Sequence, residues 1–165
     1  MDLLSDLAGG DRRSIGRVSA VVPFVLDHPE QLPVLIEGME SEDEVLRMRC
    51  ADAAEKISIS KPDWFVPLRS RLLRLARTSA QQELRWHIAQ MLPRIGLDAF
   101  QRDVAIAVLL EYLSDKSRIV RSCPRKWCSF GARRAFRTEP GTCQLAAGRL
   151  MSGSSLIVAI VSSVM

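Results

Sequence analysis

The chain has 165 residues and a formal net charge of +4; 47% of its residues are hydrophobic and only 5% are aromatic. This length suits one compact domain and is too short for two of ordinary size. Residues 1–121 hold 17 Lys and Arg against 18 Asp and Glu, so the whole positive excess falls in residues 122–165. A nucleic-acid-binding body is therefore not indicated by the overall charge.

The first ten residues are acidic and end in Gly9-Gly10, which predicts a flexible N-terminus over 1–10 without a secretory signal. Apolar residues at helical spacing then predict a helix over 11–26 that Pro23 breaks or kinks. The apolar run at 156–161 is far below the roughly 20 residues that a membrane-spanning helix needs. We expect no membrane anchor and a cytoplasmic protein whose thiols stay reduced.

Two prolines mark the start of the first helix in each of two predicted helix pairs. Pro29 and Pro62 are each followed by an acid, and both residue types are favoured in a first helical turn. A second proline follows a few residues later in both segments. We therefore expect the first helix of each pair to bend near its start. Second helices are predicted over 43–58 and 81–95.

Capping signals place two of these helices. Ser41, with Glu44 three residues later, predicts a capping box ahead of the helix over 43–58. Asp98 predicts the start of a helix that runs to Ser114. A turn at 115–117 and a further second helix are expected after it.

The strongest pattern is an internal repeat. The segment EVLRMRCA at 44–51 returns as QELRWHIA at 82–89, and a truncated third copy, RIVR, occupies 118–121. A period of about 40 residues with an apolar-Arg-x-x-apolar-Ala core predicts stacked helix pairs. The predicted fold is therefore all-α.

With Arg47 and Arg85 at the same place in the two full copies, residues 14–121 resemble the HEAT-repeat family. The resemblance implies a short α–α superhelix over residues 11–121, in which the repeated arginine links neighbouring repeats. It also implies that the second helices line a concave, partner-binding face. The third copy departs from the family pattern, since Ser122 to Arg125 stand where an apolar residue and an alanine are expected.

Charge, cysteine content and helical periodicity all change near residue 122. Pro124 falls where a helix should continue, at a cost of about 3 kcal/mol. We interpret residues 122–165 as an irregular or disordered tail, either derived from a frameshift or a genuine divergent cap or extension. The almost wholly apolar helix over 104–114 then needs cover, which predicts self-association through residues 104–121.

The sequence contains no catalytic constellation. Cys123, Cys128 and Cys143 fall short of the four ligands of a closed zinc site, and no histidine follows His87. No nucleophile is placed beside His87 by its spacing, and no glycine-rich phosphate loop is present. We expect a protein that is not an enzyme and has no metal and no cofactor.

The function indicated is a non-catalytic scaffold that binds another protein through its second helices. Adjacent Arg and Trp side chains are typical of interface hot spots, although packing between repeats is an alternative role for them. The candidate contact residues are Arg47, Met48, Arg85, Trp86 and Gln90.

A secondary basic stripe on the helix over 63–77 suits phosphates or an acidic partner, or forms an ordinary solvated face. HEAT-like folds also occur in DNA glycosylases that act on alkylated bases, so DNA binding or repair is an alternative, which the near-neutral body disfavours. A third interpretation is a non-functional remnant of a larger array, because a solenoid needs about three repeats. The stripe consists of Arg71, Arg74 and Arg77.

Overall fold

The computed structural model describes residues 2–11 and 14–122, which belong to one compact unit, and every regular element in these ranges is helical. The predicted tail, with its three cysteines, lies outside the described residues except for Ser122. The helices are α1 (Leu3–Leu7), α2 (Val18–Asp27), α3 (Leu32–Gly38), α4 (Glu44–Ser60), α5 (Arg69–Thr78), α6 (Gln82–Met91) and α7 (Ala99–Tyr112). Residues 118–122 begin a further helix.

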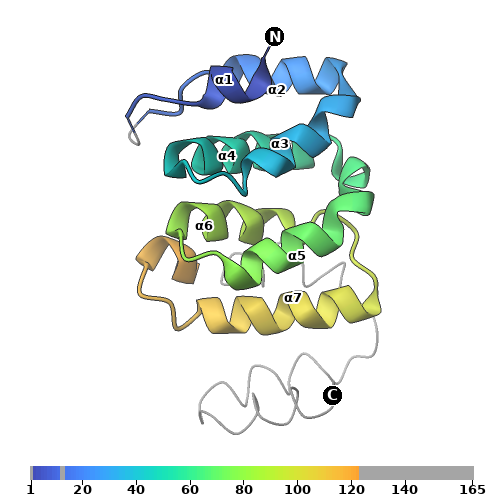
Figure 1. Cartoon of the computed structure of the whole chain (residues 1–165). Helices are drawn as coiled ribbons and strands as arrows, with labels where there is room; N and C mark the ends of the chain where they lie inside the picture. Colours follow the sequence, from blue (N-terminus) through green and yellow to red (C-terminus); the bar gives the residue numbers. More distant parts are fainter. Residues whose placement is uncertain (1, 12–13, 123–165) are drawn as a thin grey trace, which may run out of the picture. The chain divides into compact units, whose positions relative to one another are not determined.

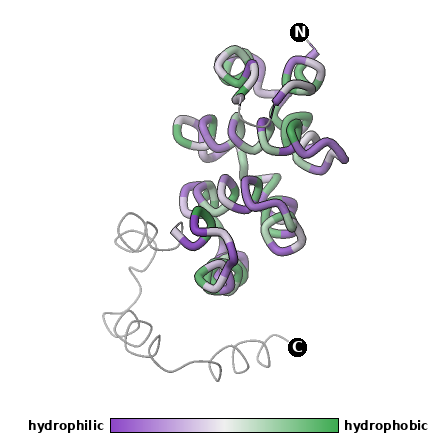
Figure 2. Tube along the Cα trace, turned by 90° about the vertical axis from the view of Figure 1, so that its left-hand side faces the viewer, coloured by the Kyte–Doolittle hydropathy of each residue, from purple (hydrophilic) through white to green (hydrophobic). Residues whose placement is uncertain are grey.

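The helices stack in two layers (Figure 1). Helix α4 packs between α2 and α6 in one layer, while α1 packs on α3, and α5 on α7, in the other. Consecutive helices from the two layers also contact each other, as α3 does α4 and α5 does α6. Figure 2 views this stack from the side, with hydrophobic and hydrophilic positions alternating along the tube. The all-α fold of stacked helix pairs is confirmed.

Residues 3–7 form helix α1 where a flexible N-terminus is predicted. Asp2 caps this helix by accepting a hydrogen bond from the Ser5 backbone N–H, and Leu3 and Leu7 are buried. Burial of two leucines offsets part of the entropy lost on ordering the segment. Helices α1 and α2 therefore add a helix pair ahead of the first predicted one.

Helix α2 begins at Val18, later than the predicted residue 11, and continues through Pro23 without a break. Gly16, which has a φ of +56°, and Arg17 instead form a turn ahead of the helix. The helix tolerates the missing N–H of Pro23 because Val21 and Val25 on either side of it are fully buried.

Both first helices start as a 3₁₀ helix at a proline, which agrees with the predicted change of direction near their starts. Pro29–Gln31 precedes α3, and Pro62–Leu68 precedes α5. Pro33 and Pro67 lack the N–H that an α-helical hydrogen bond to the residue four places earlier needs, so these first turns tighten to 3₁₀ geometry.

The predicted cap of α4 is wrong by two residues. Asp43, and not Ser41, accepts a hydrogen bond from the N–H of Val45 at 2.8 Å. Ser41 instead accepts from the N–H of Asp43 and so stabilises the preceding turn. The capping interaction at Asp98 is confirmed, since Asp98 and Gln101 bond to each other's backbone N–H groups.

Helix α4 lies at the centre of the packing. Its buried residues include Cys50, whose neighbour Gly38 lets α3 approach closely: a Cβ at Gly38 would lie 2.5 Å from the Cys50 Sγ. Burial raises the pKa of the Cys50 thiol to about 12, so this cysteine is a core residue and not a nucleophile. Among the described residues, no helix has both the length and the apolar character needed to cross a membrane.

Candidate functional site: a groove along the repeat turns

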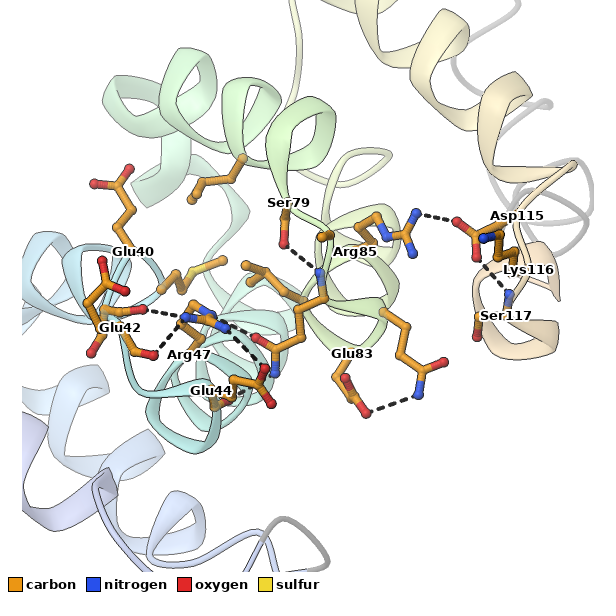
Figure 3. A pocket seen from close by; sticks show the side chains of 17 residues that line it. Glu40, Glu42, Glu44, Arg47, Ser79, Glu83, Arg85, Asp115, Lys116 and Ser117 are labelled. Carbon is orange, nitrogen blue, oxygen red and sulfur yellow. Dashed lines mark hydrogen bonds and ion pairs between the residues drawn. The ribbon is translucent and has the colours of Figure 1, made fainter.

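The turns that precede the second helices line a groove of about 660 Å³ (Figure 3). The first turn contributes Glu40 to Glu42, the second Ser79 to Gln81, and the third Asp115 to Ser117. The first residues of α4 and α6 complete its wall. The groove therefore crosses from each repeat to the next.

Arg47 forms part of this wall and is fully engaged within the protein. Its Nη1 donates to the backbone oxygens of Ser41 and Glu42 at 2.7 and 3.1 Å. Its Nε donates to the Oε1 of Gln81 at 2.7 Å, and Gln81 in turn donates to the backbone oxygen of Glu44. Arg47 therefore joins its own turn to the N-cap of α6.

Arg85 and Arg121 each make one of the two kinds of contact that Arg47 makes: Arg121 binds its own preceding turn, and Arg85 binds the next repeat. Arg121 donates to the backbone oxygens of Asp115 and Lys116, which lie six and five residues before it in the sequence. Arg47 donates in the same way to backbone oxygens six and five residues before it. Arg85 forms an ion pair with Asp115, the residue that leads into the helix at 118 (Figure 3). Arg47 and Arg85 thus each contact the residues that lead into the next second helix.

The other predicted contact residues, Met48, Trp86 and Gln90, are half-buried on α4 and α6 and do not line the groove. Trp86 packs against His87, with ring centroids 4.5 Å apart and a tilt of 55° between the planes. The structure therefore brings Arg47 and Arg85 to one groove and leaves these three residues beside it.

Two of the three arginines of the predicted basic stripe share one carboxylate. Arg71 binds the carboxylate of Glu40 through two hydrogen bonds at 3.0 and 2.7 Å, and Arg74 binds the same carboxylate at 2.7 Å. The hydrogen bond from Arg71, more than any other interaction, holds the pKa of Glu40 below its usual value. Arg77 is exposed. A stripe of three free cations is therefore not formed.

Two polar side chains at the same position of the repeat, Arg49 and His87, are buried, which corrects the expectation that His87 packs at the surface. Arg49 is 3% exposed and donates to backbone oxygens of the segment between α1 and α2. Its acceptors are Leu7 at 2.8 Å, Gly9 at 2.5 Å, Ser14 at 3.1 Å and Asp11 at 3.2 Å.

His87 is 6% exposed and lies beside Asp52 and Glu55 of α4. Asp52 is held by Lys56, and Glu55 by Arg94. Burial lowers the pKa of His87, and the nearby carboxylates oppose this effect. In the sequence, the one indication that this position faces the preceding repeat is that Arg49 and His87 align when the two copies of the repeat are superposed.

Comparison of the chain with protein-family models, with curated proteins and with solved structures found no match. The class of protein defined by the fold is a stack of helix pairs, and membership of the HEAT family stays a prediction.

Proposed function

We propose that this protein is a non-catalytic scaffold of the HEAT type that acts in the cytoplasm and holds another protein in the groove along its repeat turns. The observation that supports this proposal is the groove, which has a volume of about 660 Å³ and is lined by residues of successive repeats. Stacked helix pairs offer such continuous surfaces to macromolecular partners. Small-molecule sites are lined mainly by apolar side chains, whereas this groove is lined mainly by charged and polar ones and runs across three turns, which suits an extended segment of a partner chain better.

The charges on the wall favour a basic segment. The groove is lined by five acids and three bases; Arg85 pairs with one of these acids, Asp115, and Glu40 pairs with Arg71 and Arg74, so acids still outnumber bases along the wall. Glu42 and Glu44 are exposed along the first turn. Charge complementarity of this kind sets partner orientation and association rate. Met48, Trp86 and Gln90 remain predicted contacts on the flank of the groove.

The test is selection from a displayed peptide library on the intact chain. We expect enrichment of peptides rich in Lys and Arg, with affinity that falls as salt is raised. The double variant Glu42→Lys/Glu44→Lys should weaken the selected peptides more than about tenfold. The matched control reverses two exposed acids elsewhere, Glu30 and Asp63, and should leave binding unchanged.

Two results would contradict the scaffold proposal: no enriched peptide, or equal loss of binding in both double variants. The alternative of DNA binding or alkylated-base repair has less support because Arg71 and Arg74 are both engaged by the carboxylate of Glu40. A salt-dependent shift of duplex DNA, lost on Arg77→Ala, would favour it. The interpretation as a remnant of a larger array depends on residues outside the described part and stays a prediction.

A further inference from the structure

A second cluster lies between α4 and α6, away from the groove. Asp52 and Glu55 are three residues apart and share one face of α4. The possible ligand atoms of Asp52, Glu55 and His87 all lie within 4.8 Å of one another. The side chains of the two acids are only 14% and 12% exposed, so the cluster is not an ordinary solvated acidic patch.

His87 gives a second, independent indication of a ligand at this cluster. Its Nδ1 is buried and has no hydrogen-bond partner among the described residues. A buried polar atom without a partner is costly, and each such atom in a native protein requires a cause. At the same repeat position Arg49 is satisfied by four backbone oxygens. The second repeat therefore buries a polar group for which the described part of the chain supplies no partner.

We propose that Asp52, Glu55 and His87 bind a divalent metal ion of the zinc class between the second helices of two successive repeats. An imidazole nitrogen and carboxylate oxygens are established zinc ligands at about 2.0–2.2 Å, and three protein ligands with water in the fourth position make a complete site. Two ligands of a tetrahedral ion lie about 3.4 Å apart, so the side chains have to close by at most about 1.5 Å. This site is separate from the peptide groove and does not depend on it.

The surrounding charges decide how tightly the ion binds. Lys56 contacts Asp52 at 2.5 Å and Arg94 contacts Glu55 at 2.5 Å, so both cations compete with the metal for the carboxylates. The side chain of Lys56 is 41% exposed and can move into solvent. Desolvation lowers the pKa of His87 more than any other effect, while Asp52, Glu55 and Glu83 raise it and Lys56 lowers it. The neutral imidazole is the form that offers a lone pair to a metal.

Calorimetric titration of the full chain with ZnCl₂ tests the site, after removal of bound metal with a chelator. Cys123, Cys128 and Cys143 are replaced by Ser, because their thiols could bind zinc independently. We expect one equivalent to bind. His87→Ala and Asp52→Asn should each weaken binding more than about tenfold, whereas His28→Ala should not. Lys56→Gln should strengthen binding, because it removes a competing cation and keeps all three ligands.

The histidine resonances give a direct readout. The chain has two histidines, so long-range ¹H–¹⁵N spectra show two imidazole rings. One equivalent of Zn²⁺ should shift the resonances of His87 and leave those of His28 in place. Unshifted His87 resonances at saturating Zn²⁺, or equal affinity in the His87→Ala variant, would overturn the proposal. If His87→Ala fails to fold, the Lys56→Gln variant decides: Zn²⁺ binding that is weaker than or equal to that of the wild type would overturn the proposal.

Discussion

The residue two places after Arg47, and the one two places after Arg85, each face the preceding repeat. In the first copy this residue is Arg49, whose guanidinium organises the segment between α1 and α2 through four backbone oxygens. Gly16 lies directly against this guanidinium, since a Cβ there would be 2.8 Å from its Cζ. In the second copy the residue is His87, which faces carboxylates. One repeat position thus carries two different polar functions.

Replacing Arg49 by alanine should lower the free energy of unfolding by about 3 kcal/mol, because several buried backbone oxygens lose a charged donor. Urea denaturation followed by circular dichroism measures this change. Arg77→Ala is the matched control, since Arg77 is exposed, and should stay within about 0.5 kcal/mol of the wild type. Equal effects of the two variants would contradict the role given to Arg49.

The His87 imidazole should make stability depend on pH in a defined direction. Its pKa is lower in the folded protein than the ordinary 6.5, so the unfolded chain takes up the proton first as pH falls. Stability should therefore decline from about pH 6.5 down to the folded pKa and stay constant above that window. With a chelator present, wild type should lose more stability than His87→Leu on acidification. Parallel curves for the two proteins would disprove this.

Sequence reasoning reaches part of the candidate site. Arg47 and Arg85 are found because their spacing repeats, and a repeated helix position meets equivalent neighbours in a regular stack. The proximity of Asp52 to His87 is not predicted, because it depends on how α4 packs against α6, and no local pattern encodes that register. The pairing of Glu40 with Arg71 is missed for the same reason.

Helices with a strong local start signal are predicted best. Helix α7 begins where Asp98 indicates, because the cap and Gln101 satisfy each other within one turn. Helix α1 is missed because it has five residues, and its stability comes from burying Leu3 and Leu7 against other helices. The wrong cap of α4 reflects two competing polar residues, Ser41 and Asp43, in one turn.

The cap of α7 offers a test at this scale. Asp98→Ala should cost about 1 kcal/mol, because the Gln101 backbone N–H loses its acceptor. Asp103→Ala removes an acid of the same type from an exposed position further along the helix and should change stability by less than about 0.5 kcal/mol. Thermal or urea unfolding of both variants measures the difference. A cost at Asp103 as large as at Asp98 would contradict the capping role.

For the whole molecule, the prediction of self-association through residues 104–121 can be tested at an exposed apolar residue. Ile119 is 50% exposed, and Ile15, at the other end of the stack, is 56% exposed. We expect light scattering to show an oligomer that Ile119→Ser dissociates and Ile15→Ser leaves intact. A monomer at every concentration, or equal effects of the two variants, would contradict this prediction.

The contacts that Arg47 and Arg85 make with the next repeat both run forward along the chain, and this gives the stack a polarity. Arg47 reaches forward to Gln81, and Arg85 reaches forward to Asp115; each repeat carries the group that recognises its successor. Splicing Arg47 directly to Trp86 would excise one repeat at equivalent positions. Arg47 would then meet Asp115, and a charged partner would replace an amide. This arginine joint is therefore modular, although the same splice puts His87 in the place of Arg49 and removes the contacts of Arg49 with the chain between α1 and α2.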